Sequence, residues 1–402
     1  MRVLVIGREI SDFLCPLFRS LKEKGYVVDV LETRSKDQLK QCADSSFDNV
    51  LDIPLKVNEY SKAHIVSSLL SAYFFKKLLN TANFTTAVRE AILYKKLQPV
   101  ISGYDAVHIF FISKELFNFY DAIASAKKLI VSFWGSDILQ SNNNFDYNQH
   151  SKLIDRADAV TVHQKEMREI FLSKFGREKF DKVSEMLVVN DVSFLNDFIN
   201  AIPDKDTHIK SFKAHHNIED SKRIVAIGHS GHTIDDHVKI IKSLLPYKTN
   251  VQERICLVLP MTYGCDSEAY YEEVAAACEE LGVQYVVLKK FLTKEQMIEL
   301  RLASEILLRL SKFDAFSLSL CETLCAGNIA ITGSWLPYSK LRGNNVYYEE
   351  VYDIDDTGER LLSILDNYDL YKERCVNNPR NVMKVFEEEK SVDKLQKVYS
   401  NA

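Results

Sequence analysis

Glycine and proline are scarce in this sequence, whose 402 residues include 13 Gly and 8 Pro. The two together make up about 5% of the chain, whereas roughly 12% is usual for soluble proteins. So low a share excludes collagen-like repeats, low-complexity disorder and loop-rich secreted scaffolds. With 46% hydrophobic residues, a chain of this length is expected to fold into two or three globular domains, each with its own core.

The eight cysteines lack the spacing of a metal site or of a redox pair. There is no Cys-x-x-Cys pair, and no second pair of His or Cys residues completes a zinc ligand set for Cys321 and Cys325. No Asp-x-Asp motif falls in a plausible nucleotide-binding loop, and the one at 353–355 lies near the end of the second expected domain. We therefore predict no metal or other cofactor, and reduced, mostly buried thiols.

Long apolar runs and an excess of basic residues are also missing. No stretch approaches the roughly 20 apolar residues of a membrane span, and the first apolar run is too short for a signal peptide. The net charge is −5 and there is no basic tail, which argues against nucleic acid as a partner. A cytoplasmic location is expected.

Short apolar runs alternate with helical patterns along the chain, which is typical of parallel α/β sheets. The run at 3–6 ends at Gly7 and is followed by a helical pattern at 11–24 and a second run at 26–31. Further strands of this half are expected at 106–112, 129–133, 159–163 and 186–189. After a polar stretch at 196–222, the expected strands are 224–227, 255–259, 285–288, 306–310 and 329–332.

This alternation predicts an α/β fold with two Rossmann-like parallel-sheet domains that face a cleft. The N-terminal, acceptor-side domain is placed at 1–200 and the C-terminal, nucleotide-sugar-binding domain at 201–380. A charged helix at 381–402 is expected to cross back and pack on the N-terminal domain. Ligands bind at the carboxyl ends of the strands in such sheets, so the loops there are the places to search for a site.

One candidate loop follows the expected strand at 224–227 and consists of Gly228, His229, Ser230 and Gly231. Backbone N–H groups at the start of the next helix would bind a phosphate there. The alternative is a tight turn that merely needs two glycines. The spacing is not the Gly-x-Gly-x-x-Gly of dinucleotide enzymes, which disfavours a nicotinamide or flavin oxidoreductase.

A second candidate has two carboxylates eight residues apart, Asp314 before a helix and Glu322 on it. The start of that helix, at 316–318, would meet a diphosphate with free N–H groups, while Glu322 would accept hydrogen bonds from ribose hydroxyls. The alternative is that Glu322 is a solvated helix residue and Asp314 a helix cap.

The second candidate resembles the Glu-x7-Glu motif of the GT-B glycosyltransferases, especially the retaining family 4, with Asp314 in the place of the first Glu. Ser311, Phe316 and Ala326-Gly327 fit the same pattern. A second set of motifs resembles the lipid-linked 4-acetamido-4,6-dideoxygalactose (Fuc4NAc) transferases: Trp134-Gly135-Ser136-Asp137, Gly228-His229-Ser230-Gly231 and Leu259-Pro260-Met261-Thr262-Tyr263.

These resemblances imply a glycosyltransferase that moves a hexosyl or N-acetylhexosaminyl group from a nucleotide-diphosphate donor to a glycan or lipid-linked acceptor, in surface polysaccharide or glycoconjugate biosynthesis. The implied donor-binding residues are Gly228, His229, Ser230, Gly231, Arg309, Phe316, Ser317, Leu318 and Glu322. The implied acceptor-side residues are Gly7, Trp134 and Gly135. The catalytic candidates are Asp137, Asp314 and Glu9, with Asp137 as the first choice for a base.

The chain departs from family 4 where cations are expected against the diphosphate. His229 and Asp236 occupy those places, so the clamp must come from elsewhere; the candidates are Arg309, His232, Lys289 and Lys290. Trp134 also stands where family 4 enzymes commonly have a His, in the loop after the fourth strand. The spacing of Asp314 and Glu322 slightly favours retention of configuration, whereas the resemblance to Fuc4NAc transferases favours inversion.

Aromatic and basic residues are mixed at helical spacing between residues 73 and 96. Such a pattern suits an interfacial helix on an anionic membrane, and the resemblance to enzymes with lipid-linked acceptors favours peripheral contact with the inner face of the plasma membrane. The alternative is an amphipathic helix whose apolar face is core and whose lysines lie in water.

Two rival functions remain open from the sequence. One is a nucleotide-sugar 2-epimerase of the same fold, which would isomerise the donor without an acceptor. The other is a degenerate, non-catalytic glycosyltransferase-like binding subunit, for which the missing cationic clamp is the motive.

Overall fold

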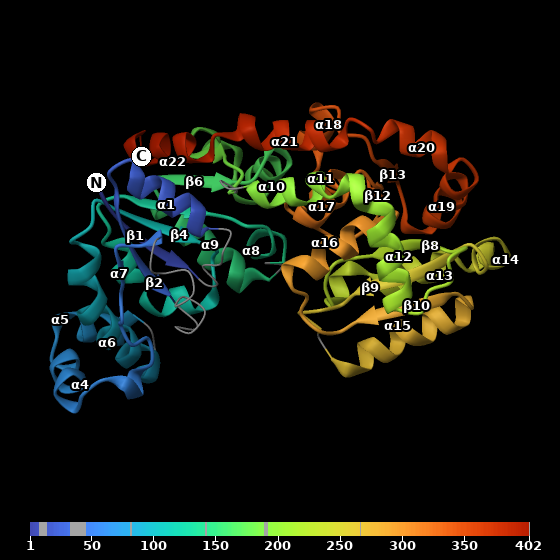
Figure 1. Cartoon of the computed structure of the whole chain (residues 1–402). Coiled ribbons are helices and arrows are strands. Elements are labelled where there is room, and N and C mark those ends of the chain that lie inside the picture. The colour runs from blue at the N-terminus through green and yellow to red at the C-terminus, as the bar shows by residue number, and fades with distance from the viewer. Residues whose placement is uncertain are drawn as a thin grey trace. The chain divides into compact units, whose positions relative to one another are not determined.

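The computed structural model describes residues 1–7, 14–32, 46–80, 83–140, 143–188, 192–265 and 267–401. The chain forms two compact units. Unit 1 consists of Met1–Asp191 and Glu389–Ala402, and unit 2 consists of Val192–Glu388. Each unit has a parallel β-sheet and its own set of helices (Figure 1).

Unit 1 has a seven-stranded parallel sheet with the order β3-β2-β1-β4-β5-β6-β7. Its strands are β1 (Arg2–Gly7), β2 (Val27–Glu32), β3 (Asn49–Val50), β4 (Ala106–Phe110), β5 (Leu129–Ser132), β6 (Ala159–Val162) and β7 (Val183–Glu185). The central strands β4 and β5 are buried along their whole length. Continuous apolar runs form them because helices cover both faces of a parallel sheet.

The helices of unit 1 lie between these strands in the chain, except for the C-terminal helix. They are α1 (Cys15–Glu23), α4 (Lys62–Leu69), α5 (Ala72–Asn80), α6 (Phe84–Ile101), α7 (Tyr120–Ala124), α8 (Ser136–Leu139), α9 (Asn144–Arg156), α10 (Lys165–Phe175) and α22 (Ser391–Asn401). Helix α10 ends where the sequence predicts, because Gly176 adopts φ +109°. The strand expected at 186–189 is displaced: the last strand is β7, which pairs with β6 through Val183 and Val160.

Unit 2 has a six-stranded parallel sheet with the order β10-β9-β8-β11-β12-β13. Its strands are β8 (Arg223–Ile227), β9 (Ile255–Pro260), β10 (Gln284–Leu288), β11 (Ile306–Arg309), β12 (Ile329–Gly333) and β13 (Glu349–Val351). The strand order reverses between β8 and β11 here, as it does between β1 and β4 in unit 1. Ligands bind at such reversal points, beyond the carboxyl ends of the strands.

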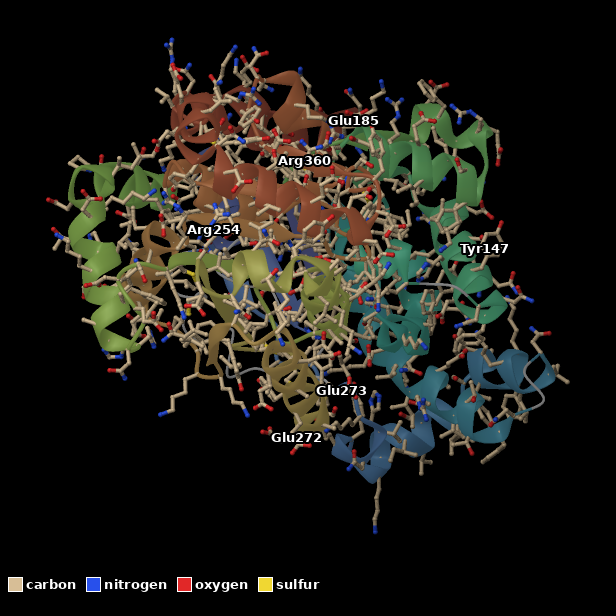
Figure 2. The ribbon with its side chains drawn as sticks, turned by 90° about the vertical axis from the view of Figure 1, so that its right-hand side faces the viewer. Tyr147, Glu185, Arg254, Glu272, Glu273 and Arg360 are labelled. Carbon is tan, nitrogen blue, oxygen red and sulfur yellow. The ribbon has the colours of Figure 1, made fainter. Side chains whose placement is uncertain are left out.

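The helices of unit 2 are α11 (Ser193–Asn200), α12 (Lys205–His215), α13 (His237–Ser243), α14 (Lys248–Val251), α15 (Glu268–Leu281), α16 (Lys294–Ala303), α17 (Leu318–Cys325), α18 (Ser339–Gly343), α19 (Thr357–Asp366), α20 (Tyr368–Arg374) and α21 (Asn378–Glu389). Helices α13, α15 and α19 contribute apolar side chains to the main core of the unit. Charged side chains such as Arg254 and Glu272 lie on its outside (Figure 2).

The C-terminal segment differs from the single helix expected at 381–402. It forms two helices, α21 and α22, because Lys390 between them adopts φ +47° and interrupts the helical backbone. Helix α22 then belongs to unit 1, where Val392, Leu395 and Tyr399 are part of the same buried cluster as β1 and α1. The C-terminal helix α22 thus packs into the same hydrophobic core as the N-terminal strand β1 and helix α1.

A row of polar side chains crosses the buried interior of unit 1. The Tyr399 hydroxyl is 2.8 Å from His108 Nδ1, and His108 Nε2 is 2.7 Å from Ser132 Oγ. Ser132 in turn shares a hydrogen bond with Thr161 on the next strand. Because burial lowers the pKa of His108 to about 3, its imidazole stays neutral in this row.

Six cysteines of the described residues are free, and five of those are buried. The expectation of reduced thiols is wrong at Cys15, which is disulfide-bonded. None of the helices in the described ranges is long and apolar enough to cross a bilayer.

The buried His108 makes unit 1 sensitive to acid. Its pKa is lowered to about 3 in the folded chain, against about 6.5 in an unfolded one, so only the unfolded state takes up the proton between these values. The free energy of unfolding should therefore fall as the pH drops from about 6 to about 4, by about 1.4 kcal/mol per pH unit from this residue. Urea unfolding at several pH values measures it. His108→Gln should remove that part of the slope, whereas His215→Gln, at an exposed position, should leave it; equal slopes in all three proteins contradict the account.

Candidate functional site

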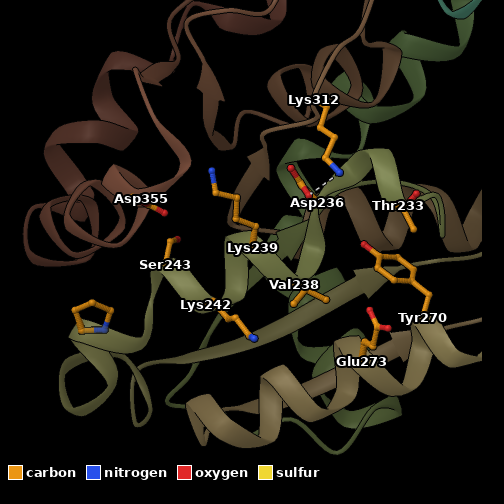
Figure 3. Close-up of a pocket in the computed structure, with 11 residues that line it drawn as sticks. Thr233, Asp236, Val238, Lys239, Lys242, Ser243, Tyr270, Glu273, Lys312 and Asp355 are labelled. Carbon is orange, nitrogen blue, oxygen red and sulfur yellow. Dashed lines mark ion pairs between the residues drawn. The ribbon is translucent and has the colours of Figure 1, made fainter. Parts of the chain in front are cut away.

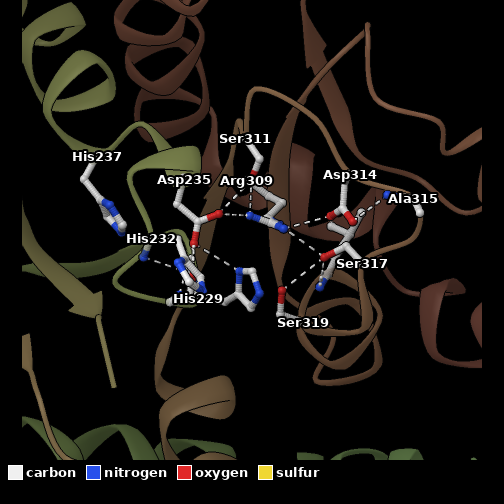
Figure 4. A network of polar contacts seen from close by, with 12 residues as sticks. His229, His232, Asp235, His237, Arg309, Ser311, Asp314, Ala315, Ser317 and Ser319 are labelled. Atoms are coloured by element: carbon white, nitrogen blue, oxygen red, sulfur yellow. Dashed lines mark hydrogen bonds and ion pairs between the residues drawn. The ribbon is translucent and has the colours of Figure 1, made fainter. Parts of the chain in front are cut away.

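Arg309 and Asp235 meet at the point where the strand order of unit 2 reverses. Arg309 is the last residue of β11, and Asp235 lies in the loop between β8 and α13. Both side chains are almost completely buried and form an ion pair through Arg309 Nη1 and Asp235 Oδ1. On the other side of the guanidinium, Arg309 Nη2 is 2.8 Å from Asp314 Oδ2 (Figure 4). We call these three residues the ion cluster.

Each buried charge of the ion cluster lies next to a charge of opposite sign. Burial opposes the positive charge of Arg309, but the Asp235 and Asp314 carboxylates raise its pKa. Burial likewise opposes the charge of Asp235, yet the Arg309 guanidinium holds the pKa of that carboxyl well below its usual range. Arg309 and Asp235 are therefore both charged at neutral pH, and the same guanidinium also contacts the Asp314 carboxylate.

The Asp235 carboxylate occupies the anion position of the loop at 228–231. Its Oδ2 accepts hydrogen bonds from the backbone N–H groups of His229 (3.2 Å) and Ser230 (3.1 Å) and from the Ser230 hydroxyl (2.8 Å). The other two amides also have acceptors in the chain: Gly228 N–H donates to Leu308 and Gly231 N–H to Tyr263. In this structure an internal carboxylate thus occupies the position expected for the phosphate, and the role of these groups in donor binding stays a prediction.

Both glycines of this loop are required by close contacts. Gly228 adopts φ +68°, and a Cβ there would be 2.8 Å from His237 Nε2. At Gly231 a Cβ would be 3.0 Å from Cys265 Cβ and 3.1 Å from its Cα. The tight turn that the sequence offered as the alternative explanation is thus the one the geometry supports.

Asp314, a catalytic candidate, is held by protein groups on both carboxylate oxygens. Oδ2 accepts from Arg309 and from the Tyr338 hydroxyl at 2.9 Å, and Oδ1 accepts from Ala315 N–H at 2.8 Å. In this arrangement the carboxylate holds the loop before α17, and the catalytic role expected of Asp314 stays a prediction.

Helix α17 begins beside the ion cluster. Ser317 caps it by accepting a hydrogen bond from Leu320 N–H, and the same hydroxyl accepts one from Arg309 Nε at 3.3 Å. None of the described residues accepts a hydrogen bond from the N–H groups of Leu318 or Ser319, the first two residues of the helix. Unpaired amides at a helix start attract anions.

Phe316, predicted as donor-binding, packs its ring edge-on against Phe386 of α21 at 5.8 Å. Its side chain therefore contributes to the packing of unit 2. Glu322 lies further along α17, where its Oε2 accepts a hydrogen bond from Arg301 Nε of α16 at 2.8 Å. Arg301 is buried, and its Nη1 has no hydrogen-bond partner among the described residues.

A separate hollow of about 720 Å³ lies over α13 in unit 2 (Figure 3). Three lysines line it, but Lys312 pairs with Asp236 at 3.2 Å and Lys239 with Asp353 at 3.6 Å. Glu273 and Asp355 add negative charge to the same walls. The mixed charges give this hollow no preference for an anion.

The acceptor-side candidates lie in unit 1. Asp137, in the first turn of α8, accepts hydrogen bonds from the N–H groups of Ile112 (3.1 Å), Trp134 (3.0 Å) and Gly135 (2.9 Å). Burial raises its pKa to about 6, although these backbone bonds oppose the shift. Gly135 adopts φ +137° before α8.

The remaining candidates in the first half of the chain are Gly7 and Glu9. Gly7 is the last residue of β1 and is buried. Glu9 lies outside the described residues, so its predicted catalytic role stays a prediction.

No group of three or more His, Cys, Asp or Glu side chains in the described parts of the chain is arranged to hold a metal ion.

Sequence comparison finds no match: no family model and no curated protein matches the chain. Solved structures do match over its whole length. A glycosyltransferase from Rickettsia africae gives a TM-score of 0.72 at 12% identity, covering 100% of this chain and 98% of that one. Anabaena HepE in complex with UDP and glucose gives 0.71 at 12% identity, with 100% of both chains covered. The chain has the GT-B fold.

A third match has the same fold. A UDP-forming trehalose-phosphate synthase from Burkholderia xenovorans gives a TM-score of 0.68 at 11% identity, covering 99% of this chain and 98% of that one. The two-sheet architecture predicted from the sequence is thereby confirmed.

Sequence reasoning missed the partners of the residues it selected. Asp235 and Tyr338 belong to no recognised motif, although Asp235 follows the selected loop within five residues. Arg301 also gave no signal, because a basic residue on a charged helix is usually solvated.

The ion cluster should dominate the stability of unit 2. Asp235→Ala leaves Arg309 buried with one carboxylate fewer and frees the loop amides, so the free energy of unfolding should fall by about 3–5 kcal/mol. The double variant Asp235→Ala with Arg309→Met should lose clearly less than the two single losses added together. Urea unfolding of the four proteins measures this coupling, and strict additivity would falsify the ion pair as described.

Proposed function

We propose that the chain is a glycosyltransferase that moves a sugar from a nucleotide-diphosphate donor, bound by unit 2, to a glycan or lipid-linked acceptor. Its main support is the start of α17, where the Leu318 and Ser319 amides have no acceptor and Glu322 follows on the same helix. The whole-length likeness to GT-B structures, one of them with UDP and glucose bound, supports the same function.

The donor diphosphate is proposed to bind against the first turn of α17. The helix dipole and the two N–H groups stabilise the charge that develops on the leaving nucleotide diphosphate. Arg301 contacts only one of the two carboxylate oxygens of Glu322. The other oxygen would accept a hydrogen bond from a ribose hydroxyl. No metal is required in this proposal, because the helix supplies the positive potential.

Arg309 receives a different role from the one inferred from the sequence. Its charge is compensated by Asp235 and Asp314, so it adds little net attraction for a diphosphate. Through its hydrogen bond to Ser317 it fixes the cap of α17 and hence the direction of the free amides. We propose it as a positioning residue.

For the stereochemistry we propose retention, on the resemblance of the Asp314 and Glu322 spacing to the family 4 motif. Inversion would need a base, and Asp137 is the candidate, since a carboxyl with a pKa of about 6 accepts a proton readily near neutral pH. The anomeric proton signal of the first-formed product, followed by NMR, distinguishes the two outcomes.

One observation favours a second candidate function, a non-catalytic nucleotide-sugar-binding subunit. The loop at 228–231, where family 4 enzymes are expected to contact the diphosphate, is occupied by Asp235. Acceptor-dependent release of the nucleotide separates the two functions, because the binding subunit would bind donor without turnover.

The proposed setting is surface polysaccharide or glycoconjugate assembly, with peripheral contact to the inner face of the membrane. Helices α4, α5 and α6 expose Leu70, Phe75, Leu79 and Phe84. The segment 56–101 contains seven Lys and Arg but two Glu, although the whole chain has a net charge of −5. An apolar surface with basic surroundings suits anionic lipid.

Two side chains of this segment, Lys77 and Tyr73, are excluded from the proposed membrane surface by their contacts within the fold. Lys77 pairs with Glu90 and Asp121, and the Tyr73 ring stacks on Tyr94 at 3.9 Å. Tyr73 therefore belongs to the packing of α5 on α6, as the alternative explanation of this segment expected, whereas Lys77 is ion-paired and largely covered and does not lie in water as that explanation had it. Phe75 and Leu79 project from the same helix with exposed fractions of 54% and 86%.

A proline at the first position of α17 tests the donor site. Leu318→Pro removes one of the two free N–H groups, yet proline is tolerated there and Ser317 already has an extended backbone (φ −105°, ψ 106°). Affinity for UDP-glucose or another nucleotide diphosphate that binds the parent, measured by calorimetry, should fall about tenfold or more. Leu318→Ala is the matched control and should bind like the parent. Equal affinities of the two variants exclude α17 as the phosphate site.

Exposed side chains of α5 test the membrane contact. The double variant Phe75→Ser with Leu79→Ser should lose co-sedimentation with vesicles that contain phosphatidylglycerol, because the buried apolar area in the interface decreases. Leu370→Ser with Val376→Ser removes comparable exposed side chains from unit 2 and should bind normally. Unchanged binding of the first variant, or equal loss in both, sinks the proposal.

A further inference from the structure

A pocket of about 290 Å³ lies in unit 1 beyond the carboxyl ends of β4 and β5. Its walls come from the segment after β4, from α8 and from the first half of α9. Figure 1 labels β4, α8 and α9. The residues of these walls that bear on its chemistry are Phe111, Ser113, Asp137, Phe145, Asp146 and His150.

Two buried polar atoms of this pocket have no hydrogen-bond partner among the described residues, Ser113 Oγ and His150 Nδ1. Ser113 is 3% exposed and His150 5%. Ser113 precedes the 3-10 helix Lys114–Phe119, but its side chain makes no capping bond there. A buried polar atom without a partner costs about 1–3 kcal/mol, so two in one pocket point to a ligand that supplies both bonds.

Aromatic rings form the apolar part of the walls. Phe145 is 62% exposed at the start of α9, and Phe117 lies nearly parallel to the His150 ring at 6.2 Å. Phe111 adopts φ +69°, which a bulky residue avoids unless the surrounding structure enforces it. Such strain is concentrated at functional sites.

The charges of the pocket exclude a phosphate-bearing ligand. Asp137, Asp146 and Glu115 line it together with a single Lys114, whose Nζ lies 3.7 Å from Asp146 Oδ1. Burial lowers the pKa of His150 to about 4, so its imidazole adds no positive charge near neutral pH. The ligand that fits is neutral and rich in hydroxyl groups, with one apolar face.

We propose that this pocket binds a pyranose ring, and that the ring is the sugar of the acceptor. Ser113 and His150 would hydrogen-bond its hydroxyls, and Phe145 would cover its C–H face. The role as acceptor site rests on the proposed function; the binding of the sugar does not. The structure thereby specifies a carbohydrate moiety, and not a lipid diphosphate, as the part of the acceptor recognised in this pocket.

Sugar binding is measured directly by saturation-transfer NMR on the full chain with methyl glycosides of glucose, galactose, mannose, N-acetylglucosamine and N-acetylgalactosamine at millimolar concentration. At least one should bind. Phe145→Ala and Ser113→Ala should each weaken its binding by at least fivefold, whereas nucleotide binding in the same samples stays unchanged. Phe145 is exposed, so its substitution leaves the core intact.

Ser151→Ala is the matched control, because Ser151 lies on the same helix with a buried hydroxyl that has no partner, yet it does not line the pocket. It should bind the sugar like the parent. No binding of any of the five glycosides, or equal weakening by Ser151→Ala, overturns the inference even where nucleotides bind. Sugar binding without nucleotide binding would instead support the pocket and contradict the proposed function.

Discussion

The positive charge of Arg309, buried at the end of β11, is the constraint on which the carboxyl edge of unit 2 depends. A buried guanidinium is stable only with carboxylates and hydrogen-bond acceptors around it. Asp235 reaches it from the loop after β8 and Asp314 from the loop before α17. Asp235 also accepts hydrogen bonds from the backbone N–H groups of His229 and Ser230. One ion cluster therefore fixes two loops and the start of a helix.

This arrangement explains which groups remain for a ligand. The amides of the β8 loop have acceptors in the chain, whereas those of Leu318 and Ser319 have none among the described residues. The cluster holds Ser317 in its capping position and so keeps the free amides directed beyond the helix. In unit 1, too, one carboxylate fixes the backbone while nearby polar atoms remain for a ligand. Asp137 fixes the turn at Gly135, whereas Ser113 Oγ and His150 Nδ1 have no hydrogen-bond partner among the described residues.

The sequence predicted the two sheets well because parallel strands buried on both faces are continuous apolar runs. It also selected two loops that follow strand ends, since a strand end followed by glycine or by paired carboxylates is a local signal; their role in donor binding stays a prediction. It could not predict that Asp235 and Arg309, 74 residues apart, share one ion pair, because long-range pairing leaves no local pattern. Lys390 gave no sign of its φ of +47°, as lysine is an ordinary helix former.

A crystal structure of the full chain grown with UDP tests the central claim most directly. The account predicts the diphosphate oxygens within hydrogen-bonding distance of the Leu318 and Ser319 N–H groups, with the pair of Asp235 and Arg309 intact. A diphosphate bound to the amides of His229 and Ser230 in place of Asp235, or bound away from α17, would contradict it.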